Sequence, residues 1–174
     1  MAMEYASKIR IVEGFPHAGI SFKDISTLLA DQEAFHAAVD DLSGALKELS
    51  PDAVVGPESR GFVLGAPAAY AANLPFIMAR KPGKLPGETK KKTYQIEYGV
   101  DSIEIPSFAI HPGMKVVLVD DLMATGGTFK ALKELIEEMG GKVIGIVCLI
   151  ELTDLKGRDL FPDVPLYSFV KYAH

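Results

Sequence analysis

The stretch that decides the fold is residues 116–128, Val-Val-Leu-Val-Asp-Asp-Leu-Met-Ala-Thr-Gly-Gly-Thr. Its first four residues are apolar, as in a strand that is buried on both faces of a parallel sheet. Two carboxylates, Asp120 and Asp121, follow at the end of this strand, and a Gly-Gly turn then opens a predicted helix. In parallel sheets the ligand site lies beyond the carboxyl ends of the strands. We therefore expect the functional site around residues 120–128.

The turn after the two carboxylates has the composition of a phosphate-binding loop. Backbone N–H groups at the start of a helix bind anions, and glycine lets a ligand approach them closely. Adjacent carboxylates at a buried strand end are costly without a partner, and they can accept hydrogen bonds from a sugar diol. The spacing fits a ribose 5-phosphate, whereas the Walker and dinucleotide-binding glycine patterns are both absent. The predicted phosphate-binding residues are Ala124, Thr125, Gly126, Gly127 and Thr128.

The segments on both sides of this stretch predict alternating strands and helices. Helices are expected at 32–49, with Asp31 as N-cap, at 61–72 and at 127–139. Buried strands are expected at 52–56, 75–79, 115–119 and 143–150, with a possible last strand at 166–170. A loop is expected at 81–92 and a hairpin outside the main sheet at 94–105. This order predicts an α/β fold in which helices flank a twisted parallel sheet.

Composition excludes several classes of protein. The chain has 174 residues and a formal charge of −5, which fit one domain, residues 1–174, that is not a general nucleic-acid binder. The single cysteine, Cys148, excludes a disulfide framework and is expected in the core. The charge-free stretch 62–79 contains two prolines and an asparagine, so it predicts a buried helix and strand rather than a membrane span. No secretory leader is visible, and a cytoplasmic protein is expected.

A second loop and a group of basic residues could bind a diphosphate. In the segment 56–62, Gly-Pro-Glu-Ser-Arg-Gly-Phe, small residues flank Arg60 at the start of a predicted helix. Residues 80–92 carry six of the chain's 18 Lys and Arg: Arg80, Lys81, Lys84, Lys90, Lys91 and Lys92. Such a local cluster in an acidic protein favours an anionic ligand, and its Gly and Pro content suggests a mobile lid.

The segment 15–25, Phe-Pro-His-Ala-Gly-Ile-Ser-Phe-Lys-Asp-Ile, precedes the main α/β unit. It could be a packing arm with its two phenylalanines in the core. It could also be a hood over a flat ligand, with Phe22 stacked on a base.

These motifs, in this order, resemble those of the type I phosphoribosyltransferases, and in particular the adenine phosphoribosyltransferases. The resemblance covers about residues 9–172 and includes the segments 81–87, 94–99 and 151–158. It implies the type I phosphoribosyltransferase fold, with a hood at about 1–30 and a mobile loop and flap hairpin at about 81–105. It also implies transfer from phosphoribosyl diphosphate (PRPP) to adenine, giving AMP and diphosphate. Mg²⁺ would be bound through PRPP without direct protein ligands, and the protein would be a homodimer.

The resemblance also implies a role for each matching residue. Residues 124–128 would hold the 5′-phosphate, and Asp120 and Asp121 would face the ribose hydroxyls. Adenine would contact the backbone of Ser21 and Lys23, with Phe22 and Leu152 against its faces. Glu97, beside Tyr98 in the flap, would exchange a proton with adenine N7; it joins Asp121 and Arg60 as the predicted catalytic residues. The diphosphate would meet Glu58, Ser59, Arg60, Arg80, Lys81 and Lys84, next to a non-proline cis peptide at Glu58–Ser59.

The sequence can be compared with three other functions. A transferase of the same fold could use hypoxanthine, guanine or xanthine, although the hood segment favours adenine. A ligand-sensing regulator could keep the fold without chemistry, but the intact residues 58–60 favour catalysis. A metalloenzyme is rejected because the histidines, His17, His36, His111 and His174, lack metal-ligand spacing.

Overall fold

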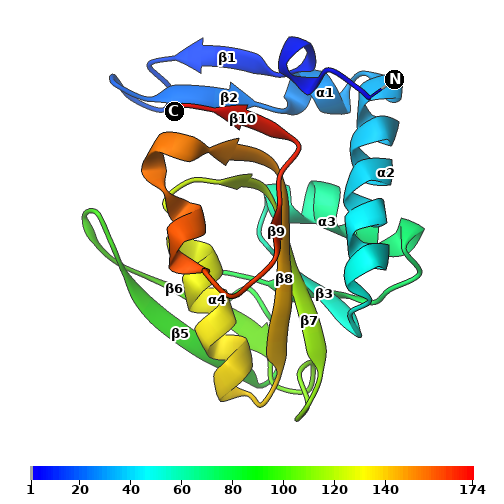
Figure 1. The fold of residues 1–174 in the computed structure, drawn as a ribbon. Helices are drawn as coiled ribbons and strands as arrows, with labels where there is room; N and C mark the ends of the chain where they lie inside the picture. The colour runs from blue at the N-terminus through cyan, green and yellow to red at the C-terminus, as the bar shows by residue number, and fades with distance from the viewer. Residues whose placement is uncertain (1) are drawn as a thin grey trace.

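A six-stranded parallel sheet forms the centre of the molecule, which the computed structural model describes for residues 2–174 (Figure 1). Its strand order is β10-β8-β7-β3-β4, with β9 also paired to β8. The strands are β3 (Ala53–Pro57), β4 (Phe76–Ala79), β7 (Lys115–Met123), β8 (Lys142–Leu152), β9 (Leu166–Tyr167) and β10 (Val170–Tyr172). All the pairings within it are parallel, so the predicted α/β fold is confirmed.

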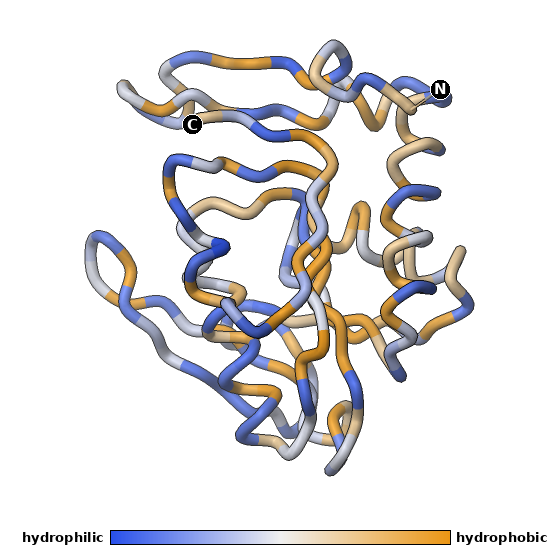
Figure 2. The backbone as a smooth tube through the Cα atoms, in the orientation of Figure 1, coloured by the Kyte–Doolittle hydropathy of each residue, from blue (hydrophilic) through white to orange (hydrophobic). Residues whose placement is uncertain are grey.

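Helices cover both faces of this sheet. Helices α2 (Gln32–Leu49) and α3 (Arg60–Ala71) pack on one face, where Val54 and Val117 are fully buried. Helix α4 (Gly127–Glu138) packs on the other face with Val55 and Leu118, because successive strand residues point to opposite sides. Figure 2 shows the hydrophobic residues concentrated along these central strands.

A two-stranded hairpin lies outside the main sheet, as predicted. Its strands are β5 (Thr89–Ile96) and β6 (Gly99–Pro106), and Ile103 and Ile105 of β6 are buried against the face that carries α4. The predicted loop at 81–92 was therefore wrong from Thr89 onward. The basic residues 90–92 lie within β5, where the buried isoleucines of the paired strand stabilise an extended backbone.

Two other predicted boundaries differ from the structure. Strand β7 continues four residues beyond the predicted end, because it stays paired with β8 as far as Met123 and Glu151. The predicted last strand is two short strands, β9 and β10. They are separated at Ser168, whose hydroxyl donates to Glu151. By contrast, α2 has the predicted bounds and cap, with Asp31 accepting a hydrogen bond from the Ala34 N–H at 3.0 Å.

The N-terminal elements lie over the carboxyl ends of the central strands (Figure 1). They are the 3₁₀ turn η1 (Tyr5–Lys8), the antiparallel strands β1 (Arg10–Glu13) and β2 (Ser21–Asp24), and the short helix α1 (Ser26–Leu29). We call the β1–β2 hairpin the hood. The last strand, β10, brings the C-terminal residues beside β2.

Two further observations concern the single cysteine and possible membrane-spanning helices. Cys148 is fully buried in β8, as predicted, and burial raises the pKa of its thiol. No helix among residues 2–174 is long and apolar enough to cross a membrane.

Candidate active site

The loop between β7 and α4 presents the start of a helix at the hood end of the sheet. Gly126 has a φ of +86°, which a glycine adopts without strain, and α4 begins at the next residue. A Cβ atom at Gly126 would lie 3.1 Å from the Gly157 carbonyl oxygen, so the position is also crowded. Thr125 is exposed and Thr128 is half-buried, and the two residues flank the Gly-Gly step at which α4 begins. This arrangement can bind a phosphate.

The two carboxylates before this loop differ in environment. Asp121 is only 3% exposed, and its Oδ2 lies 3.1 Å from the Nε of Arg60 as an ion pair without hydrogen-bond alignment. The Asp121 N–H donates to the Oδ1 of Asp120 at 2.7 Å. Burial, and then the charge of Asp121, raises the pKa of Asp120 well above its ordinary value. Asp121 is therefore the ion-pair partner of Arg60, and Asp120 protonates more readily than an ordinary aspartate.

Glu58 organises the basic residues near the second loop. Its carboxylate accepts hydrogen bonds from the Nε of Arg80 at 3.1 Å, the Lys81 N–H at 2.8 Å and the Nζ of Lys84 at 2.8 Å. Burial alone would raise the pKa of Glu58, but these partners outweigh it and hold the pKa below its ordinary value. Its own N–H donates to the Ala79 carbonyl. Glu58 thus holds together Arg80, Lys81 and Lys84, which were predicted to bind diphosphate. Its own carboxylate is already hydrogen-bonded to these residues.

The peptide bond between Glu58 and Ser59 is cis, as expected from the resemblance. Arg60 follows at the start of α3, and its guanidinium lies over the ring of Phe22, 4.8 Å from the ring centre. Arg60 therefore joins the hood to Asp121. The predicted ribose and diphosphate residues and the predicted base-stacking ring come together at this point.

The face of the hood that carries Phe22 has a small hollow. Phe15 lies edge-on to Phe22 with ring centres 5.1 Å apart, and neither ring belongs to the hydrophobic core on either face of the sheet. The ring is half-buried rather than enclosed, which leaves it able to contact a flat ligand. The hollow is lined by Arg10, Val12, Phe15, Phe22 and Asp24.

Comparison with known proteins agrees with this geometry. Residues 26–171 match the phosphoribosyl transferase domain family. The adenine phosphoribosyltransferase of Desulfitobacterium hafniense is 50% identical over 171 residues, which cover 98% of this chain and 99% of that protein. This chain belongs to the adenine phosphoribosyltransferase family.

Solved structures of the family have the same fold. The adenine phosphoribosyltransferase of Thermoanaerobacter pseudethanolicus has a TM-score of 0.94 at 44% identity, with 99% of this chain and 100% of that chain covered. The enzyme of Saccharomyces cerevisiae has a TM-score of 0.88 at 37% identity, with 97% of each chain covered. That structure was solved with adenine and an imino-altritol bisphosphate.

The flap residues stand apart from the rest of the site. Glu97 and Tyr98 form the exposed turn of the β5–β6 hairpin, which projects clear of the central strands (Figure 1). The hairpin does reach the site at Tyr94 and Asp101, the third residue pair from its turn, since the Tyr94 hydroxyl lies 3.4 Å from the Oγ1 of Thr128 and Lys81 pairs with Asp101. The structure therefore does not bring Glu97 to the other predicted residues, and its catalytic role stays a prediction.

Glu151 is a buried carboxylate beside the site whose structural role was not predicted from the sequence. It lies at the end of β8 and is 4% exposed. Arg158 donates to both of its carboxylate oxygens, at 3.1 and 2.7 Å, and the Ser168 hydroxyl donates at 2.7 Å. This network holds the turn at 153–160 in place, and Gly157 of that turn packs against Ala124 and Gly126 of the phosphate loop. Neighbouring Leu152 is half-buried at the same strand end. A lone acidic residue at the end of an apolar strand was the available signal.

No group of three or more His, Cys, Asp or Glu within residues 2–174 is arranged to hold a metal ion. His17 lies in the hood turn, His36 in α2, His111 in the loop before β7 and His174 beside Asp154.

Proposed function

We propose that the protein transfers the 5-phosphoribosyl group of PRPP to adenine and releases AMP and diphosphate. The bond between ribose C1 and the diphosphate oxygen breaks, the N9 lone pair of adenine forms a bond to C1, and the imidazole proton of adenine passes from N7 to the Glu97 carboxylate. The observation that carries this proposal is the position of Asp120 and Asp121, between a helix-start phosphate loop and the Arg60 loop under the hood.

The arrangement supports a single orientation of PRPP. With the 5′-phosphate on residues 124–128 and the ribose hydroxyls on Asp120 and Asp121, C1 points toward Arg60. The diphosphate then meets Ser59, Arg60 and the basic residues that Glu58 gathers. The carboxylates face the positive charge that develops on ribose, and the cations face the leaving group. Preorganised charges of this kind are worth about 2–4 kcal/mol each in the barrier.

Magnesium fits this orientation as a partner of the substrate. Mg²⁺ commonly takes most of its ligands from substrate phosphates and water, with few from the protein. The absence of a three-ligand group among residues 2–174 is compatible with a metal that arrives with PRPP. When bound, Mg²⁺ would neutralise the leaving diphosphate, while Arg60, Arg80 and Lys84 orient it.

Adenine is proposed to lie between the hood and the end of β8. Phe22 and Leu152 would contact its two faces, and the backbone of β2 would read its polar edge. Glu97 would exchange a proton with N7 once the flap closes over the bound substrates. The structure of the yeast relative with adenine supports the choice of base.

The test is diphosphate release with PRPP and Mg²⁺, with adenine, hypoxanthine, guanine and xanthine offered in parallel. We expect release with adenine and its loss on addition of EDTA. Release only with a 6-oxopurine would keep the phosphoribosyl site and overturn the choice of base. No release with any base, together with a thermal shift from PRPP, would favour a ligand-sensing role.

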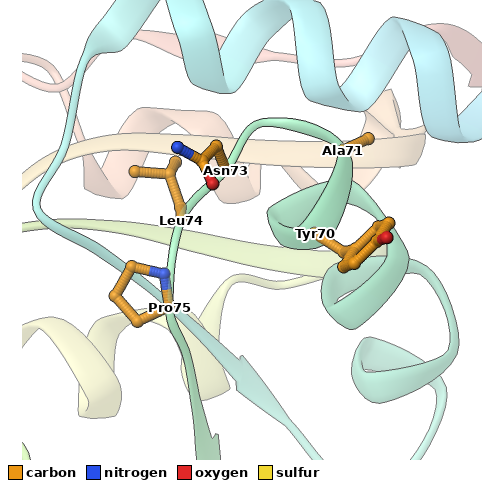
Figure 3. A pocket seen from close by; sticks show the side chains of 5 residues that line it. All are labelled: Tyr70, Ala71, Asn73, Leu74 and Pro75. Carbon is orange, nitrogen blue, oxygen red and sulfur yellow. The ribbon is translucent and has the colours of Figure 1, made fainter.

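We also propose that the enzyme is a homodimer in the cytoplasm. Residues 61–71 of α3 contain no charged side chain, yet Val63 is 39% and Tyr70 88% exposed. A helix that is apolar on all sides is normally buried on all sides. Met78 on the edge strand β4 is also exposed. At the end of α3, Tyr70, Leu74 and Pro75 surround a hollow that could accept a partner side chain (Figure 3).

A further inference from the structure

Tyr94 lies on the face of the β5–β6 hairpin that packs on the rest of the molecule. In β5 the exposed residues Thr93 and Gln95 alternate with the half-buried Lys92 and Tyr94, as expected for a strand with one face on the core. The Tyr94 ring packs against the hydrophobic cluster to which Ile103 of the hairpin and the apolar face of α4 belong. This packing directs its hydroxyl toward α4 and away from solvent.

A second contact on the same face of β5 fixes the strand to α4. The Nζ of Lys92 donates to the carboxylate of Glu138 and lies 3.5 Å from that of Glu134, and both glutamates belong to α4. Lys92 and Tyr94 are two residues apart, so their side chains point to the same side of the strand. Because α4 begins at the phosphate loop, these ion pairs hold Tyr94 at a set distance from that loop.

The Tyr94 hydroxyl lies between two polar groups, one in α4 and one in the hairpin. Its oxygen is 3.4 Å from the Oγ1 of Thr128 and 3.4 Å from the Oδ2 of Asp101. A strong hydrogen bond between hydroxyls is about 2.8 Å long, so the Tyr94 hydroxyl is within reach of both groups and held tightly by neither. Asp101 has other donors, since it pairs with Lys81 and its Oδ1 accepts from the Ser102 N–H at 2.8 Å. The single proton of the Tyr94 hydroxyl is therefore free to turn toward Thr128.

Thr128 needs a donor of this kind when a phosphate is bound. A hydroxyl has one proton and two lone pairs, so it can donate to one group while it accepts from another. With a 5′-phosphate on residues 124–128, the Thr128 proton points to a phosphate oxygen, and its Oγ1 is left to accept. The Tyr94 hydroxyl is placed to donate to that oxygen.

We propose that Tyr94 is a positioning residue of the 5′-phosphate site: its hydroxyl donates to Thr128 and so directs the Thr128 proton onto the phosphate. This inference rests on the proposed function. Hydrogen bonds in a chain polarise one another, so the charge of the phosphate strengthens the bond between Tyr94 and Thr128. The same bond connects the phosphate to the flap, because Glu97 lies three residues beyond Tyr94 on the hairpin.

The test measures the Kd of AMP and of inorganic diphosphate by calorimetry in the wild type, Tyr94→Phe, Thr128→Val and the double variant. AMP carries a 5′-phosphate and diphosphate does not, so a local effect on the phosphate loop separates the two ligands. We expect Tyr94→Phe, which keeps the ring and removes the hydroxyl, to raise the Kd of AMP about fivefold and to leave that of diphosphate unchanged. Because Tyr94 acts through Thr128, adding Tyr94→Phe to Thr128→Val should not weaken AMP further. The control, Tyr167→Phe, removes the hydroxyl of a half-buried tyrosine in β9 and should change neither Kd.

An unchanged Kd for AMP in Tyr94→Phe would overturn the proposal, and so would an equal loss with both ligands, which is the result of a purely structural role. A further fivefold loss of AMP affinity in the double variant would also overturn it. Should Tyr94→Phe fail to fold in a thermal melt, hydrogen exchange decides. Saturating ribose 5-phosphate should protect residues 95–100 in the wild type and not in Thr128→Val, and equal protection overturns the proposal. A wild type that binds AMP but releases no diphosphate from PRPP with adenine would contradict the proposed function alone, because these binding measurements do not depend on turnover.

Discussion

The guanidinium of Arg60 touches two parts of the site at once. It balances the buried Asp121 at 3.1 Å and covers the ring of Phe22. Removing the charge of Asp121 while keeping its shape should release Arg60 and weaken the contact with the ribose diol. We expect Asp121→Asn to lower kcat/KM by about 30- to 1000-fold, which corresponds to about 2–4 kcal/mol in the barrier. Steady-state kinetics with a thermal melt checks this.

The matched control is Asp163→Asn, which changes an exposed carboxylate outside the site. Near-wild-type kinetics for Asp121→Asn would rule out the diol role. An equal loss in both variants would point to a general effect of charge.

Glu58 gives a prediction that depends on pH. Its folded pKa lies below the ordinary value of 4.5, so the ionised form stabilises the folded state. This contribution is fully present above about pH 4.5 and is lost as the pH falls through the folded pKa. Glu58→Gln should therefore flatten part of the acid-induced fall in Tm. Because Arg80 and Lys84 lose their shared partner, the KM of the Glu58→Gln variant for PRPP should also rise.

Thermal unfolding from about pH 3 to 7 and PRPP titrations test both effects. The exposed Glu88→Gln is the control, and a Tm profile parallel to wild type would contradict the assignment.

The turn after β8 supports the phosphate loop through close packing. A Cβ atom at Gly157 would lie 2.5 Å from the Ala124 carbonyl oxygen and 2.7 Å from the Sδ of Met123. Gly157→Ala must therefore push these two elements apart. We expect a loss of about 1–3 kcal/mol in the free energy of unfolding and a higher KM for PRPP.

Denaturant unfolding and PRPP kinetics measure these two effects. Gly44→Ala in α2 is the control, because a Cβ atom there meets nothing within 4 Å. It should leave KM unchanged and stabilise α2 by up to about 1 kcal/mol. Unchanged PRPP kinetics in Gly157→Ala would show that this turn does not support the loop.

Elements whose signals are local were predictable from sequence. Helix α2 has both an apolar face and a cap at Asp31, and residues 116–128 carry strand, carboxylates and loop in one run. The start of β5 was missed because its lysines have loop-like composition, while the residues that stabilise the strand lie across the hairpin at Ile103 and Ile105. The Glu151–Arg158 pair and the role of Glu58 depend on contacts between segments. Hydrophobic periodicity carries no information about such contacts.

The site is built from segments that lie far apart in the sequence. The hood, the phosphate loop and the turn at 153–160 meet above one end of the sheet (Figure 1). The exposed face of α3 lies on the flank of the sheet near its edge strand β4, next to the loop that carries Arg60. A second copy docked on this face would cover apolar surface and would also hold the start of α3 in place.

This dimer provides the last prediction. Sedimentation of the wild type should give about twice the chain mass of 18.8 kDa, because an isolated chain would leave the apolar face of α3 in water. Tyr70→Glu places a charge in that interface and should shift the protein to monomers, with kcat/KM reduced because Arg60 lies at the start of the same helix. The control is Phe108→Glu, which changes an aromatic side chain that is equally exposed, at 88%, in the loop before β7. A monomeric wild type, or a Tyr70→Glu variant that stays dimeric, would show that the two copies do not meet on α3.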